Sequence, residues 1–151
     1  MNIRMARVTD YETLKKIKPS INDRTIEERL KKQKEGKVEF MVLEDNNEPV
    51  SFVLLKWEGK KTHPEYPDME DLYTKEESGR KGYATLLIKE CEKRVKEKGF
   101  KKIGMAVNPD KNSKAKVFYE RLGYKHYGSK PYVDAVYNGA EDWVIDLEKE
   151  M

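Results

Sequence analysis

The sequence has little cysteine, no long apolar run and little net charge, and each shortage argues against a class of protein. Its single cysteine, Cys91, cannot form an internal disulfide or a cysteine metal cluster, and it favours a reducing compartment. No window approaches the roughly 18 apolar residues that span a bilayer. The 31 Lys and Arg residues and the 28 Asp and Glu residues give a net charge of only +3, which is too small to indicate nucleic-acid binding. We therefore expect a cytoplasmic protein without a membrane or nucleic-acid partner.

The chain length and composition favour one folded domain over residues 1–151. Hydrophobic residues make up 37% and charged residues 39% of the 151 residues. This mixture can bury one core of ordinary size and leaves a surface rich in both signs of charge.

Apolar periodicity predicts how strands and helices follow one another. The predicted strands cover residues 3–8, 38–43, 50–57, 69–74, 103–107, 124–127 and 143–147. The predicted helices cover the segment after Thr9, residues 25–35, residues 84–98 and residues 115–122, with loops over 58–67 and 128–141. This order predicts an α/β (α+β) fold with a central mixed sheet flanked by about four helices.

A glycine-spaced turn precedes the third predicted helix. Gly79, Arg80, Lys81 and Gly82 follow the strand over 69–74. Free amides at a helix start, the helix dipole and two basic side chains favour a phosphate or pyrophosphate ligand. The spacing matches neither the P-loop nor the dinucleotide-binding pattern, so ATP and NAD are poor candidates. The alternative is an ordinary solvated turn.

The fourth predicted helix carries a stripe of three residues that share one face. Asn112, Ala115 and Tyr119 lie at i, i+3 and i+7 and span about 10 Å. An amide, a small side chain and a phenol could line a groove for an extended ligand. Alternatively, Tyr119 is an ordinary core aromatic residue.

Together, these two segments resemble the GNAT N-acetyltransferases over about residues 69–124. The family's [QR]-x-x-G-x-[GA] loop is similar to residues 79–84, with Gly79 in place of Gln or Arg and with Arg80 next to it. The family's Asn-x-x-Ala-x-x-x-Tyr-x-x-x-Gly-Phe pattern is similar to residues 112–124, with Tyr124 in place of Phe.

The resemblance implies a GNAT-like fold, acetyl-CoA as cosubstrate without a metal, and acetyl transfer to a primary amine. It implies Tyr119 as the general acid that protonates the departing CoA thiolate. It also implies backbone contacts to the acetyl oxygen from a splayed strand end. The residues expected to contact acetyl-CoA are Leu72, Tyr73, Thr74, Gly79, Arg80, Lys81, Gly82, Tyr83, Ala84, Thr85, Asn112, Ala115 and Tyr119.

Amine attack requires a base, because an amine with a pKa near 10 is protonated at neutral pH. Asp68, Glu70 and Asp71 lie on the strand before the turn. Alternation places Asp68 and Glu70 on one face and Asp71 on the other. Glu70 is the candidate base, since Met69–Leu72 also resembles the carboxylate-bearing strand of polyamine acetyltransferases. Asp68, Asp71 or water remain alternatives, as does a merely solvated strand end.

The acids near Glu70 favour a small cationic amine as acceptor, selected by the first two helices and the loops over 58–68 and 128–141. The alternatives are a noncatalytic acyl-CoA-binding or regulatory module and an acetyltransferase for protein lysines or N-termini. An exposed sheet edge would suit a homodimer. Cys91 lies in an apolar helical stripe, which favours packing and direct transfer. We interpret His63 as a flexible-loop residue and His126 as strand surface.

Overall fold

One mixed sheet organises the computed structural model, which describes residues 1–79 and 81–151. Within these residues its strand order is β1-β2-β3-β4-β5-β7-β6, and only the β4–β5 pair is parallel. The strands are β1 (Asn2–Met5), β2 (Val38–Asp45), β3 (Glu48–Lys56), β4 (Asp68–Thr74), β5 (Lys102–Val107), β6 (Tyr132–Tyr137) and β7 (Ala140–Glu150). The α-helices are α1 (Tyr11–Ile17), α2 (Asp23–Lys34), α3 (Tyr83–Glu97) and α4 (Ser113–Arg121). The predicted mixed sheet with about four helices is confirmed.

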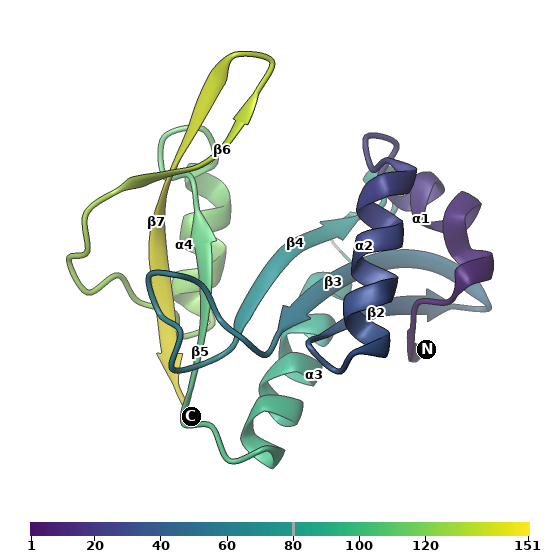
Figure 1. Cartoon of the computed structure of the whole chain (residues 1–151), viewed down its shortest axis with the longest axis horizontal. Helices are drawn as coiled ribbons and strands as arrows, with labels where there is room; N and C mark the ends of the chain where they lie inside the picture. Colours follow the sequence, from purple (N-terminus) through teal and green to yellow (C-terminus); the bar gives the residue numbers. More distant parts are fainter. Residues whose placement is uncertain (80) are drawn as a thin grey trace.

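Two apolar clusters cover the two faces of the sheet (Figure 1). On one face, Leu14 of α1 and Ile26 of α2 are buried together with Phe40 and Phe52 of the sheet. On the other face, the buried side of α3 packs on Met41, Leu55 and Met69 among others. Alternation along β2 and β3 supplies apolar side chains to both faces, which is why each of these strands contains a run of consecutive apolar residues.

The C-terminal hairpin differs from the prediction. Residues 128–141 were expected to form a loop, but Tyr132–Tyr137 is strand β6, paired antiparallel with β7. The turn between them is Asn138-Gly139, with φ of 50° and 79°. Positive φ at both central residues matches the twist of a two-residue hairpin, and Asn-Gly is the pair that tolerates it best.

The predicted strand over residues 124–127 is wrong. Gly123 leaves α4 with φ of 100°, and only Lys125 then pairs with a strand residue, Glu148. Tyr124 instead inserts into the core, where it is completely buried and donates a hydrogen bond to Glu92 of α3 at 2.7 Å. Local alternation there reflects one anchoring aromatic residue and not a strand.

The N-terminal strand is shorter than predicted, because a 3-10 turn (Val8–Asp10) interrupts it. Asp10 is buried and accepts hydrogen bonds from both Arg4 guanidinium ends, at 2.8 and 2.9 Å, and from the Arg7 backbone at 2.7 Å. Burial alone would raise the pKa of Asp10, but the Arg4 and Arg7 hydrogen bonds outweigh it and the pKa is lowered.

We expect Asp10→Asn to lower the free energy of unfolding at neutral pH by about 2 kcal/mol. Because the native pKa of Asp10 is depressed, its contribution is full above the ordinary carboxyl value of about 4 and is lost as pH falls below it. The difference between wild type and variant in urea melts should therefore shrink on acidification. The exposed neighbour variant Glu12→Gln should show neither effect; a constant difference at all pH values would contradict the assignment.

Candidate functional site

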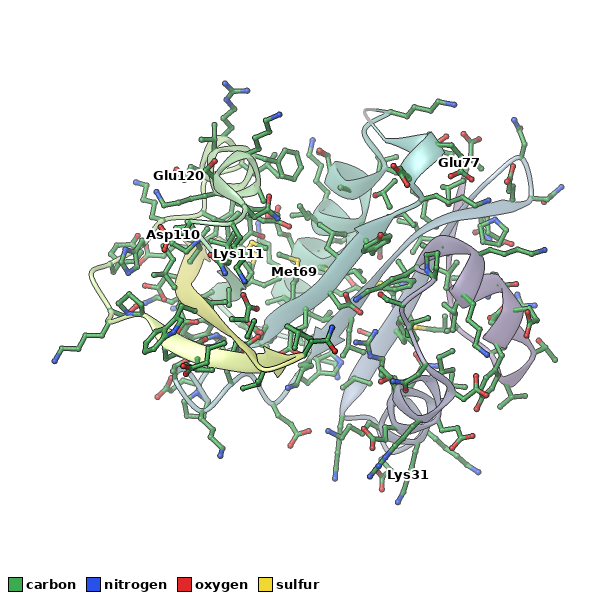
Figure 2. All side chains as sticks on the ribbon, turned by 90° about the horizontal axis from the view of Figure 1, so that it is seen from above. Lys31, Met69, Glu77, Asp110, Lys111 and Glu120 are labelled. Carbon is green, nitrogen blue, oxygen red and sulfur yellow. The ribbon has the colours of Figure 1, made fainter. Side chains whose placement is uncertain are left out.

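The site begins where β4 and β5 separate. They pair only at Asp68–Gly104 and Met69–Met105, and beyond this point the two strands diverge (Figure 1). The divergence opens a groove of about 790 Å³ between the two halves of the molecule. Figure 2 labels Met69 of β4 and, toward the α4 side, Lys111, and both residues line the groove. Residues from the α1–α2 connection, α2, β4, β5, α4 and the β6–β7 hairpin line the groove.

A bulge in β4 shapes the wall of the groove. Leu54 of β3 lies opposite Glu70 and Phe52 lies opposite Tyr73, so β4 has one extra residue between them. Asp71 within this bulge has φ of 52°. The bulge breaks the strand's alternation, which local sequence could not indicate.

The prediction that Asp71 faces away from Glu70 is wrong for this reason. The Asp71 carboxylate contacts Lys18 at the end of α1 at 2.6 Å and Arg29 of α2 at 2.9 Å. Both partners lie on the side of the sheet that Leu54 and Glu70 also face. Asp71 therefore holds two cations at the groove and is already paired twice.

The turn before α3 leaves the first helical amides open. Gly82 is the N-cap of α3 with φ of 80°, and no side chain among the described residues caps this end. The left-handed backbone at Gly82 explains the glycine, since a Cβ there would meet nothing within 4 Å. Half-buried Ala84 and Thr85 form the first turn, while Gly79 and Lys81 are exposed. Arg80 lies outside the described residues.

Tyr83 has a structural role that sequence reasoning missed. Its ring is buried in the core on the α3 side, and its hydroxyl donates a hydrogen bond to Asp45 at the end of β2. This hydrogen bond raises the pKa of Tyr83. Only the backbone of Tyr83 is left to face a ligand at the helix start.

The predicted stripe on α4 is brought together at the groove. Asn112 is the N-cap of α4 and accepts a hydrogen bond from the Ala115 backbone at 3.4 Å. Asn112, Ala115 and Tyr119 all line the groove. Burial raises the pKa of Tyr119 to about 12, so the phenol carries its proton throughout the physiological range.

The end of β4 contributes one of its three predicted residues to the groove wall. Leu72 lines the groove. Tyr73 packs instead with Phe52 on the α1 side, and the Thr74 hydroxyl pairs with Ser51 at 3.0 Å. Beyond Met69, the edge of β4 that faces β5 has no strand partner among the described residues.

The two acids at the start of β4 differ in their surroundings. Glu70 is half-buried and pairs with Lys56 at 3.2 Å. Asp68 is completely buried, and its Oδ1 lies 3.1 Å from Nε2 of His63. Among the residues with assigned positions, Asp68 Oδ2 has no hydrogen-bond partner. Both acids line the groove.

The interpretation of His63 as a flexible-loop residue is wrong. Its ring is 3% exposed and stacks on Tyr66 at a centroid distance of 4.3 Å. Burial alone would lower the pKa of His63, but the hydrogen bond with Asp68 outweighs it and the pKa is raised. Burial also raises the pKa of Asp68. The hydrogen bond with His63 opposes this rise, and the neighbouring Glu70 adds to it. His126 is exposed as expected, although not on a strand, and contacts the Ser129 carbonyl at 2.8 Å.

Two further contacts join the groove walls and have no local sequence signal. Lys60 donates to Asp134 of β6 at 2.8 Å, across 74 positions of sequence. Asn108 donates to Asp142 of β7 at 2.8 Å, across 34 positions. These pairs fix the loop over 58–67 and the end of β5 against the C-terminal hairpin.

Cys91 is completely buried in α3, and burial raises its pKa, which confirms the packing role. Within residues 1–79 and 81–151, no cluster of three or more His, Cys, Asp or Glu side chains is arranged to hold a metal ion. No helix in the same ranges combines the length and the apolar character needed to cross a membrane.

Comparison with solved structures shows where this architecture recurs. PaiA N-acetyltransferase from Thermoplasma acidophilum, solved with coenzyme A, superposes with a TM-score of 0.72 at 18% identity over 99% of this chain and 98% of that one. The ribosomal-protein-alanine N-acetyltransferase from Brucella melitensis superposes with a TM-score of 0.80 at 12% identity over all of both chains. Naa20 from Chaetomium thermophilum, solved with a bisubstrate analogue, superposes with a TM-score of 0.77 at 21% identity over 100% of this chain and 87% of that one.

These identities show a shared fold. No curated protein matches the sequence. The model of the acetyltransferase (GNAT) family matches residues 6–124, which include the strand separation, the turn before α3 and the α4 stripe. The chain therefore belongs to the GNAT family of acetyltransferases.

Proposed function

We propose that this chain transfers an acetyl group from acetyl-CoA to a primary amine by direct attack in the groove between β4 and β5. The observation that carries the proposal is the groove itself, where the edge of β4 that lacks a strand partner among the described residues faces the half-buried phenol of Tyr119. The α3 start, which no described side chain caps, follows β4 along the chain. Acetyl-CoA would supply an activated thioester, and every other part of the chemistry falls to side chains and amides of this chain.

Coenzyme A fits the groups at the start of α3 and along the groove. The open amides after Gly82 suit its diphosphate, and Lys81 adds a positive charge at the turn. Along α4, Ala115 leaves room for an extended chain beside Asn112. The unpaired edge of β4 near Leu72 can donate a backbone hydrogen bond to the acetyl oxygen, where negative charge develops during attack.

Tyr119 and Glu70 are the proposed acid and base. Glu70 accepts a proton from the ammonium group, so that the nitrogen keeps the electron pair with which it attacks the acetyl carbon. Tyr119 donates its proton to the sulfur as the carbon–sulfur bond breaks. The second proton that the attached nitrogen loses in becoming an amide then restores the Tyr119 phenol. Burial disfavours a thiolate in the groove for the same reason that it raises the pKa of Tyr119, and proton transfer removes that charge.

A small cationic amine is the proposed acceptor. Glu70, Asp68, Asp134 and Asp142 line the acceptor side of the groove. Their charge attracts an ammonium group, although Lys56 pairs with Glu70, Lys60 with Asp134 and His63 with Asp68.

A polypeptide amine is the second candidate acceptor, and the openness of the site favours it. The groove is not enclosed, and it extends from the α1–α2 connection, at Ser20 and Asn22, to Tyr137 on the hairpin. A lysine side chain or protein N-terminus could enter such a groove with its polypeptide chain outside.

Incubation of the pure protein with acetyl-CoA and an amine panel tests the proposed function. The panel includes polyamines, amino acids and short peptides with free N-termini or lysines, and release of free CoA is followed. We expect turnover with at least one amine above the hydrolysis rate. Tight acetyl-CoA binding without any turnover would instead indicate a noncatalytic acyl-CoA-binding module. Turnover confined to peptides would replace the small amine by the second candidate.

A further inference from the structure

The hydrogen bonds of His63 require a proton between its ring and Asp68. Nδ1 lies 3.2 Å from the backbone carbonyl of Tyr66, and a carbonyl can only accept. Nδ1 therefore carries a hydrogen. In neutral imidazole Nε2 would then be an acceptor, yet it lies 3.1 Å from Oδ1 of Asp68. Either His63 is doubly protonated or Asp68 is protonated, because two acceptors cannot form this hydrogen bond.

The fold makes specific room for this pair. A Cβ on Gly104 of β5 would lie 2.9 Å from both Cε1 and Nε2 of His63 and 3.0 Å from the Tyr66 ring. Such contacts are too short, so the strand needs glycine to admit the imidazole beside Asp68. The result is an ionisable pair with both members almost fully buried, directly behind the groove.

The charges around the pair favour the cationic form of His63. Asp68 and Glu70 of β4 lie on one side, and Asp146 of β7 adds a further negative charge. Tyr66, stacked on His63, donates a hydrogen bond to Glu148 of β7. The cations facing this group are Lys60, which Asp134 pairs, Lys56, which Glu70 pairs, and Lys102, which lies 3.7 Å from Glu148. Asp146 acts on His63 and Lys60 acts on Asp68, so these two charges favour the proton on the imidazole and not on the carboxyl group.

We propose that His63 is held as a buried cation that keeps Asp68 ionised behind Glu70, so that two carboxylates together receive the proton of the acceptor amine. The N–H bond of the ammonium breaks and leaves its electron pair on nitrogen, while an O–H bond forms on Glu70. Oδ2 of Asp68, which has no hydrogen-bond partner among the described residues, then accepts a hydrogen bond from that new O–H. Asp68 and His63 are thus positioning residues for Glu70. This inference rests on the proposed function.

The protonation of His63 can be measured without any activity. The sequence has two histidines, so nitrogen-15 NMR of the imidazoles gives two sets of signals, and the set lost in His63→Gln is that of His63. We expect both His63 nitrogens to carry protons at about pH 7.5, one unit above the ordinary histidine value. In Asp68→Asn, His63 should become neutral at this pH. A singly protonated His63 in the wild type would overturn the proposal.

Two variants test the role in proton transfer through opposite shifts of the pH–rate profile. His63→Gln keeps a donor where Nε2 lies but cannot carry charge. Loss of the cation should move the acidic limb of kcat/KM upward by about one pH unit and lower the rate at neutral pH about tenfold. Asp68→Asn removes a negative charge beside Glu70 and should move the limb downward. KM for acetyl-CoA should stay unchanged in both.

If His63 and Asp68 served only to stabilise the fold, we would expect a different pattern. Gln would then restore the wild-type profile, and neither variant would shift the limb, which would overturn the proposal. Tyr66→Phe is the matched control, because it removes the hydrogen bond to Glu148 at 2.5 Å and keeps the stacked ring. It should alter thermal stability without moving the limb. Absence of turnover in the wild type would refute the proposed function. If His63 were nevertheless doubly protonated, the buried cation would stand and only its use in catalysis would be refuted.

Discussion

Replacement of Tyr119 by phenylalanine should lower kcat about 100-fold, the lower end of what a general acid contributes. The variant keeps the aromatic ring, which packs edge-on against Phe118 and Tyr124 at ring-centroid distances of 5.2 and 6.4 Å. It removes only the proton donor from the groove. The dissociation constant for acetyl-CoA should therefore stay within about twofold of the wild-type value.

Steady-state rates combined with calorimetric binding separate these two effects. Tyr127→Phe serves as the control, because Tyr127 is 62% exposed and does not line the groove. It should change neither quantity. If Tyr119→Phe weakened acetyl-CoA binding as much as it slowed turnover, Tyr119 would be a binding residue and another group would protonate the sulfur.

Replacement of Glu70 by glutamine should lower kcat/KM for the amine about 100-fold at neutral pH. Gln fills the same volume but cannot accept a proton. The deficit should shrink as pH approaches the amine pKa near 10, because the amine then loses its proton without assistance. Rates measured from neutral to alkaline pH provide this comparison.

The matched control for this variant is Glu97→Gln, an exposed acid at the far end of α3. Its pH profile should coincide with that of the wild type. A Glu70→Gln deficit that stays constant up to alkaline pH would assign Glu70 to amine binding through charge and not to proton transfer.

The parts of the site that sequence could predict are those encoded by local spacing. Asn112, Ala115 and Tyr119 share a face because three and four residues make about one helical turn, and the structure places all three at the groove. The glycine before α3 was predicted from its neighbours, and its φ of 80° agrees with that reading. A local signal was also overlooked, since Asn138-Gly139 indicates a hairpin.

The remainder depends on residues that are distant in sequence. His63 looked unimportant because its position behind Asp68 depends on Gly104 of β5, which no local pattern connects to either. Arg29 meets Asp71 only because the β4 bulge turns that carboxylate toward α2. Tyr124 looked like strand sequence, and its anchor, Glu92, lies on another element. Tertiary packing decided these positions, and it overrides periodicity over short segments.

Calorimetric titration of the protein with coenzyme A tests whether the cofactor binds at the turn before α3, which every proposed step requires. We expect one site per chain, with an affinity that falls as ionic strength rises, since the proposed diphosphate contacts are backbone amides and positive charge. Gly82→Val, which strains the φ of 80° at the N-cap, should weaken binding strongly. No heat of binding with the wild type, or equal affinity in Gly82→Val, would contradict it.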